Sequence, residues 1–118
     1  MPNPITWWEV NGKDGKMLQQ YYAGLFGWYI DANNPMEYGM VDTHTDKGIY
    51  GGVSHSDQGP SVVIYVEVDD PQTYLDKAIK MGGKLVMPVT VIPNMVTMAQ
   101  FADPEGNVVG IIKSEAQG

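Results

Sequence analysis

Two glutamates, Glu9 and Glu67, are the side chains of this sequence best suited to chemistry. Trp7 lies two residues before Glu9, and Tyr65 lies two residues before Glu67. Both pairs fall in strand-like segments, where alternate residues share a face, so each carboxylate would lie beside an aromatic ring. Such carboxylates can act as general acid and base, or can bind the ammonium or guanidinium group of a ligand. A third interpretation places both in water near strand ends, where they do neither.

Strands must position these side chains, and the first half of the chain predicts a strand, a helix and three further strands. Apolar residues recur at helical spacing from Lys16 to Phe26, with Gln19 and Gln20 turned away from the apolar face, and Gly27 ends the helix. The predicted elements are a strand at 5–10, the helix at 16–26, and strands at 28–30, 37–43 and 48–53.

The second half repeats this order after a polar, glycine-containing segment at 54–60, which we interpret as a linker. Asp70 and Pro71 are typical of a helix start, and Gly82-Gly83 of a helix end. The predicted elements are a strand at 61–68, the helix between Asp70 and Gly82, and strands at 84–92, 95–102 and 107–113, with Pro93-Asn94 as a turn.

The two halves can be overlaid with one sequence offset. Asp14 matches Asp70 and Gly27 matches Gly83, since 70 − 14 and 83 − 27 are both 56. A repeat at half the chain length is typical of a duplicated architecture. We therefore predict a single α+β domain over 1–118, with two βαβββ modules at about 5–54 and 61–113 that form a curved mixed sheet around a cleft.

Strand alternation divides each module into a cleft side and a helix side. The residues predicted to face the cleft are Trp7, Glu9, Val63, Tyr65 and Glu67. Those predicted to pack under the helices are Trp8, Val10, Ile64, Val66 and Val68. A one-residue error in register would exchange the two sets.

Composition narrows the classes of partner. The formal charge of −7 disfavours nucleic acids and anionic membranes, because an acidic surface repels phosphate groups. The absence of cysteine excludes disulfides, thiolate metal sites and cysteine nucleophiles.

The sequence shows no leader-like segment and no apolar run long enough to span a bilayer, so we expect a cytoplasmic protein. A domain this small would gain stability from self-association, and we expect a homodimer.

Short motifs in both halves point to a known family. One helix ends in Phe26-Gly27, the next follows Asp69-Asp70 and ends at Gly82-Gly83, and the last hairpin turns at Asp103-Pro104-Glu105-Gly106-Asn107. With this combination the chain resembles, over 5–113, the glyoxalase/bleomycin-resistance/extradiol-dioxygenase group, the vicinal oxygen chelate superfamily. The resemblance implies the fold given above. It does not select one function, because the family includes lyases, isomerases, dioxygenases, transferases and antibiotic-binding resistance proteins.

The resemblance also implies where a divalent metal would be held. Enzymes of the family use a histidine seven residues before the aspartate of a module, and those positions here are Trp7 and Val63. They use a glutamate three residues after the asparagine of the last turn, and that position is Gly110. Residues 51–54 offer no imidazole or carboxylate for the remaining ligand. Because a metal site needs two or three good ligands, we expect no metal or other cofactor.

Two histidines, His44 and His55, are the weaker metal candidates. His55 lies one residue from position 54, which the offset of 56 relates to Gly110, so a small bulge would carry it into the cleft beside Glu9 and Glu67. The plainer interpretation is that both histidines are exposed in polar loops.

Two functional hypotheses follow from these residues. The first is metal-independent binding of a small hydrophobic or cationic organic molecule, such as the antibiotic sequestration of bleomycin-resistance proteins. The second is a glyoxalase-like lyase or isomerase that uses a relocated divalent metal, or Glu9 and Glu67 as an acid and base pair. The expected ligand-binding residues are Trp7, Glu9, Val63, Tyr65, Glu67 and Gly110.

Overall fold

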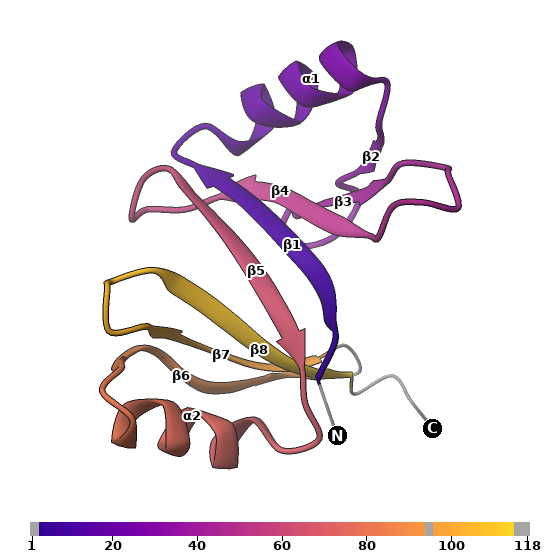
Figure 1. The fold of residues 1–118 in the computed structure, drawn as a ribbon. Helices are drawn as coiled ribbons and strands as arrows, with labels where there is room; N and C mark the ends of the chain where they lie inside the picture. The colour runs from indigo at the N-terminus through magenta and orange to yellow at the C-terminus, as the bar shows by residue number, and fades with distance from the viewer. Residues whose placement is uncertain (1–2, 94–95, 115–118) are drawn as a thin grey trace. The chain divides into compact units, whose positions relative to one another are not determined.

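The computed structural model describes residues 3–93 and 96–114. The chain divides into two compact units, and the division falls within the first and fifth strands. We call residues 7–63 the N-terminal unit, and residues 3–6 together with 64–114 the C-terminal unit. Each unit is described by itself below, with the element labels of Figure 1.

The N-terminal unit has the predicted order of elements. Its elements are β1 (Ile5–Gly12), α1 (Gly15–Phe26), β2 (Tyr29–Asp31), β3 (Gly39–Asp42) and β4 (Gly51–His55). The strands lie in the order β2-β3-β4-β1, with β1 parallel to β4 and the other neighbours antiparallel. Asp14 begins α1 by accepting a hydrogen bond from the Met17 N–H, and Gly27 ends it with a φ of 72°.

The C-terminal unit repeats this arrangement. Its elements are β5 (Ser61–Glu67), α2 (Pro71–Lys80), β6 (Lys84–Ile92), β7 (Val96–Ala102) and β8 (Val108–Ser114). The strands lie in the order β5-β8-β7-β6, and β5 is parallel to β8. The prediction of an α+β fold with two βαβββ modules is confirmed. Two residues of the predicted second half, Asn94 and Met95, lie outside the described residues.

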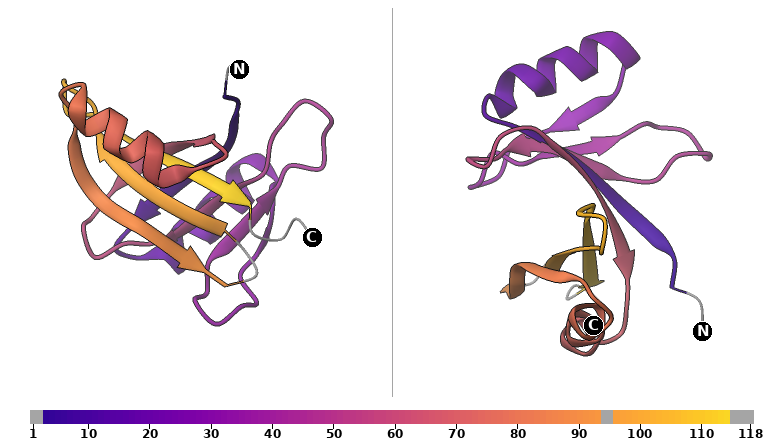
Figure 2. Two further views of the ribbon diagram at one scale, coloured as in Figure 1. Left: turned by 90° about the horizontal axis from the view of Figure 1, so that it is seen from below. Right: turned by 60° about the vertical axis from the view of Figure 1, so that its left-hand side comes forward.

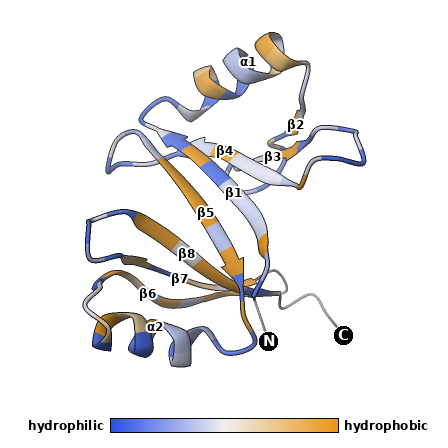
Figure 3. Ribbon diagram, in the orientation of Figure 1, coloured by the Kyte–Doolittle hydropathy of each residue, from blue (hydrophilic) through white to orange (hydrophobic). Residues whose placement is uncertain are grey.

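The core of the C-terminal unit lies between α2 and its sheet. Figure 2 shows α2 running across β6, β7 and β8, and Figure 3 shows apolar residues on β5, β8 and α2. Val66 and Val68 belong to this core, as their alternation predicts. Ile64 was expected there too but is 41% exposed, because α2 covers β6 to β8 and leaves the start of β5 outside its reach. The buried centre consists of Val68, Leu75, Ala99 and Ile111.

Aromatic rings join helix and sheet in the N-terminal unit. The Trp8 and Trp28 ring centroids are 5.3 Å apart, and Tyr22 of α1 stacks on Trp28 at 5.7 Å. Trp8 therefore lies on the helix side, as predicted. The expectation for Gln19 was wrong: its amide turns inward and donates to the backbone of β4. Among the described residues no helix is both long and apolar enough to cross a membrane.

Candidate functional site

Trp7 and Glu9 of β1 are linked through a residue that the sequence did not single out, Tyr38. The Trp7 Nε1–H donates to the Tyr38 hydroxyl over 2.9 Å, and that hydroxyl donates to Glu9 Oε2 over 3.0 Å. An indole nitrogen can only donate, so the direction of this chain of hydrogen bonds is fixed. The Asn11 Nδ2–H donates to the other carboxylate oxygen of Glu9 over 3.1 Å. The three side chains of Trp7, Glu9 and Tyr38 thus form a partly buried polar cluster.

Tyr38 occupies its place because one glycine of β4, Gly52, leaves room. Glu9 pairs with Gly52 in the parallel register of β1 and β4. A Cβ atom added to Gly52 would lie 1.8 Å from the Tyr38 hydroxyl oxygen, so no larger residue fits without moving the tyrosine. The long loop between β2 and β3 brings Tyr38 to this point. A single sequence does not reveal such a long-range contact, although the Gly51-Gly52 pair was the available signal that something large packs there.

The C-terminal unit contains a similar tyrosine and glycine contact. Tyr65 is 1% exposed and pairs with Gly110 in the parallel register of β5 and β8. A Cβ atom at Gly110 would lie 2.1 Å from the Tyr65 ring. The Tyr65 hydroxyl accepts a hydrogen bond from Gln100 Nε2 over 2.7 Å. Within its own unit, Tyr65 is therefore a packed side chain that covers the backbone of Gly110.

The remaining residues expected in the site have different surroundings. Val63, at the end of the N-terminal unit, is 2% exposed. Glu67 has an exposed side chain, and its backbone N–H donates to the Pro4 carbonyl over 2.8 Å. Glu67 and Glu9 belong to different units, and their proposed pairing as acid and base stays a prediction.

Strand register corrects one expectation about His55. Glu9 and Tyr65 are related by the offset of 56, but their partners Gly52 and Gly110 are separated by 58 residues. Gly52, rather than position 54, is thus the equivalent of Gly110, and His55 lies three residues beyond it. His55 is the last residue of β4 rather than part of a loop, so the predicted linker at 54–60 begins two residues too early.

His55 is held by two acceptors. Its Nδ1 lies 2.8 Å from the Lys13 carbonyl oxygen, and its Nε2 lies 2.7 Å from Asp57 Oδ1. Only a doubly protonated imidazole donates to both. The hydrogen bond with Asp57 raises the pKa of His55 above its ordinary value, with a smaller contribution from the Lys13 carbonyl. His44, in contrast, lies in an exposed hairpin and stacks on Tyr29, with the two ring centroids 5.5 Å apart.

The residues at the positions that the family uses for a divalent metal do not fit one. The Trp7 indole has no lone pair to offer and donates to Tyr38, and Val63 presents a buried isopropyl group. Gly52 and Gly110 have no side chain and lie under tyrosine rings. Across residues 3–93 and 96–114, no group of three or more His, Asp or Glu side chains is placed to hold a metal ion.

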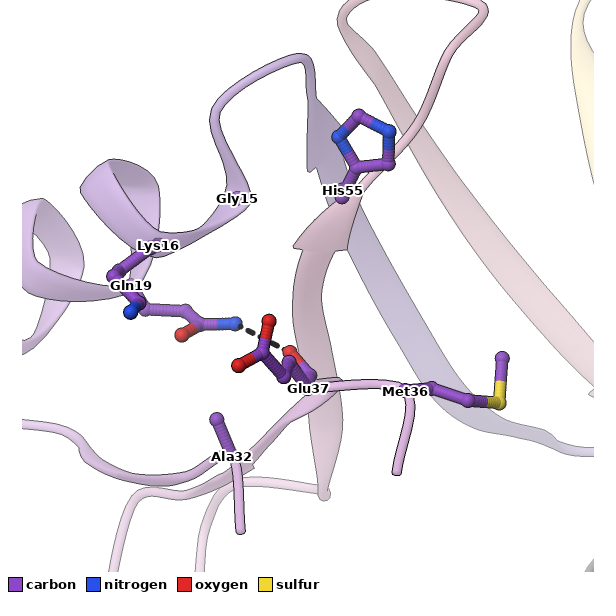
Figure 4. Close-up of a pocket in the computed structure, with 7 residues that line it drawn as sticks. All are labelled: Gly15, Lys16, Gln19, Ala32, Met36, Glu37 and His55. Atoms are coloured by element: carbon purple, nitrogen blue, oxygen red, sulfur yellow. Dashed lines mark hydrogen bonds between the residues drawn. The ribbon is translucent and has the colours of Figure 1, made fainter. Parts of the chain in front are cut away.

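Two hollows open in the N-terminal unit. The smaller, of about 230 Å³, lies below α1, and Figure 4 shows Gln19 reaching across it to the Glu37 carbonyl. The larger, of about 680 Å³, has apolar walls from Leu18, Tyr22 and Val62. The residues lining the smaller hollow are Gly15, Lys16, Gln19, Ala32, Met36, Glu37 and His55.

The fold agrees with comparisons to known proteins. Residues 5–111 match the family described as the Glyoxalase/Bleomycin resistance protein/Dioxygenase superfamily, and the chain belongs to this superfamily. A crystal structure of a superfamily member from Vibrio splendidus 12B01 has a TM-score of 0.61 at 15% identity, covering 96% of this chain and 100% of that one. This likeness shows the fold.

Two curated relatives resemble the sequence more closely. The protein named "Putative glyoxylase CFP32" of Mycobacterium bovis is 28% identical over 114 residues, which cover 90% of this chain and 44% of that protein. The "Anthracycline biosynthesis protein DnrV" of Streptomyces peucetius is 24% identical over 123 residues, which cover 89% of this chain and 45% of that protein. The chain thus spans less than half the length of these relatives.

Proposed function

We propose that this protein binds a small organic cation with an aromatic or hydrophobic body, without a metal, and that Glu9 and Trp7 recognise it. The observation that carries the proposal is the hydrogen-bonded cluster of Trp7, Tyr38 and Glu9. Asn11 and Tyr38 each donate to one oxygen of the Glu9 carboxylate, and a carboxylate oxygen can accept more than one hydrogen bond. An indole beside a fixed carboxylate attracts a cation both by its ring face and by charge.

The whole-chain charge and the name of one relative support the same class of ligand. A formal charge of −7 attracts cations to the surface generally. The name of one relative refers to anthracycline biosynthesis, and anthracyclines combine a flat aromatic system with an amino sugar. Sequestration of such an antibiotic, with no turnover, is the mechanism that we propose for this chain. The proposal includes the homodimer and the cytoplasmic location expected from the sequence.

The first experiment compares a matched pair of probes, benzylammonium and benzyl alcohol, by tryptophan fluorescence. We expect benzylammonium to bind at least about tenfold more tightly, a difference of about 1.4 kcal/mol, because only it carries a charge for Glu9. Glu9→Gln should remove this preference, and Glu105→Gln, an exposed control in the last turn, should leave it unchanged. Equal affinity for both probes, or no effect of Glu9→Gln, would contradict the proposal.

Tyr38→Phe tests the cluster itself. This variant keeps the ring beside Gly52 but removes the hydroxyl that joins Trp7 to Glu9. We expect benzylammonium to bind about three- to tenfold more weakly, and stability to fall by about 1 kcal/mol, because two hydrogen bonds are lost in a partly buried site. Tyr29→Phe, on an exposed strand, is the control and should change neither. The dissociation constant and the urea midpoint of each variant provide the measurement.

The alternative is a glyoxalase-like lyase or isomerase, which the name of one relative favours. The distinguishing experiment adds Zn²⁺, Ni²⁺, Mn²⁺ or Fe²⁺ to metal-free protein and then supplies the hemithioacetal of methylglyoxal and glutathione. Stoichiometric binding of one ion together with metal-dependent turnover would establish the enzyme. Recovery of unchanged daunorubicin after its binding to the protein would instead support sequestration.

A further inference from the structure

We infer that Gln19 of α1 is a positioning residue for this site: it holds the segment 34–38 in the conformation that carries the Tyr38 hydroxyl to Trp7 and Glu9. The inference rests on the function proposed above, because that function makes the cluster of Trp7, Tyr38 and Glu9 a ligand-binding site. Its geometric part concerns only contacts within the N-terminal unit.

Gln19 connects α1, β4 and the loop before β3 through one amide group. Its Nε2 donates to the Val53 carbonyl of β4 over 2.9 Å and to the Glu37 carbonyl over 3.1 Å. A side-chain amide has two N–H groups, so both are used by these two acceptors. Gly39 leaves space for this amide, since a Cβ atom there would lie 2.8 Å from Gln19 Nε2. Figure 4 shows the Gln19 side chain spanning the hollow from α1 to Glu37.

The peptide group between Glu37 and Tyr38 is held at both of its ends. Its carbonyl oxygen accepts from Gln19, and its N–H donates to Asn34 Oδ1 over 2.9 Å. The Asn34 Nδ2–H also donates to the Tyr38 carbonyl over 2.8 Å. Two amide side chains from different elements therefore set the direction in which the Tyr38 side chain leaves the backbone.

This peptide group needs such restraint, because Glu37 adopts a φ of 52°. A residue with a Cβ atom takes this left-handed conformation at a cost, and it persists where surrounding contacts determine it. At the far end of Tyr38, the hydroxyl must lie within hydrogen-bond distance of both Trp7 and Glu9. A small rotation of the held peptide would move that hydroxyl away from one partner or both.

Gln19→Leu tests the inference, with Gln20→Leu as the control on the exposed side of the same helix. The readout is the Trp7 indole N–H signal in NMR spectra of the free protein, which reports directly on its hydrogen bond with Tyr38. We expect Gln19→Leu to shift this signal and to speed its hydrogen exchange, and Gln20→Leu to leave it unchanged. Benzylammonium should bind about tenfold more weakly to Gln19→Leu, as expected for the loss of about one hydrogen bond.

A rescue variant separates positioning from general damage. In Gln19→Leu/Glu37→Gly, glycine adopts the positive φ freely, so the segment should regain its conformation and the indole signal should move back toward that of the wild type. Gln19→Asn keeps the amide but is one methylene shorter, and it should reproduce the shift if the leucine variant does not fold. An unchanged indole signal in folded Gln19→Leu or Gln19→Asn would overturn the inference. Failure of wild-type protein to bind benzylammonium would refute the proposed function alone, because the indole measurement needs no ligand.

Discussion

At the scale of single residues, the recurring contact is a tyrosine ring over a glycine in a parallel strand pair. Tyr38 lies at Gly52 in one unit and Tyr65 at Gly110 in the other. Gly110 is also the position where enzymes that this chain resembles carry a metal-binding glutamate. A glutamate at position 110 would place its Cβ atom about 2.1 Å from the Tyr65 ring, which is too close for both to fit. A glutamate at position 110 therefore requires the Tyr65 ring to move.

Gly110→Ala tests this packing. A methyl group 2.1 Å from the Tyr65 ring forces a buried side chain to move, so we expect a loss of about 1–3 kcal/mol in the free energy of unfolding. Gly24→Ala is the matched control, because nothing lies within 4 Å of its Cβ position in α1. That variant should gain about 0.5–1 kcal/mol from helix propensity. Urea denaturation measures both, and a neutral Gly110→Ala would show that the ring does not cover the glycine.

His55 provides a prediction about pH. Because the pKa of folded His55 lies above its ordinary value of 6.5, its bond with Asp57 stabilises the protein fully below that value. The stabilisation is lost as pH rises through the higher, folded pKa. The stability difference between wild type and Asp57→Asn should therefore be largest near pH 6 and disappear at alkaline pH.

The hydrogen bond between His55 and Asp57 can also be tested by measuring the pKa of His55 directly. NMR titration should show a lower pKa of His55 in Asp57→Asn, because this substitution changes the hydrogen-bond partner that raises that pKa most. An unchanged pKa of His55 in Asp57→Asn would contradict the role given to this hydrogen bond.

At the scale of elements, the two helices begin differently although both start with aspartate. Asp14 accepts from the Met17 N–H over 3.0 Å, whereas Asp70 accepts from the Thr73 hydroxyl over 2.8 Å. That Thr73 bond lowers the pKa of Asp70. A side chain that accepts from a backbone N–H of the first helical turn, as Asp14 does, stabilises the helix directly.

Asp14→Ala should accordingly destabilise the protein by about 1 kcal/mol, the usual loss for an N-cap side chain. The exposed Asp69, which precedes α2, offers a control that removes the same charge without removing a cap. Thermal unfolding of Asp14→Ala and Asp69→Ala gives the comparison. If both variants lose the same amount of thermal stability, then the removed charge explains the effect and the helix cap does not.

Local patterns predicted the elements well because alternation, apolar spacing and glycine ends are properties of neighbouring residues. The helix end at Gly27 and the core positions Val66 and Val68 follow from such patterns. Strand register does not, since it depends on loop lengths that differ between the modules. The shift from an offset of 56 to one of 58 moved the equivalent of Gly110 from position 54 to Gly52. Gln19 was misplaced because its amide bonds the backbone and does not follow the apolar face.

At the scale of the whole molecule, family membership and acidity were accessible from the sequence, but the candidate site was only partly so. Trp7 and Glu9 were predicted to share one strand face, and in the structure Tyr38 links their side chains by hydrogen bonds. Tyr38 was missed because a loop brings it from 29 residues away in the chain. The hydrogen bonds by which Asn34 and Gln19 hold that loop are likewise visible only in the structure.

The central claim is that Glu9 recognises an organic cation and that no metal takes part. Calorimetric titration of benzylammonium into wild-type protein, before and after removal of metals with a chelator, tests both parts when it is repeated with Glu9→Gln. We predict one dissociation constant for both wild-type samples and at least about tenfold weaker binding to Glu9→Gln. Binding that disappears with the chelator and returns with one equivalent of Zn²⁺ would contradict it.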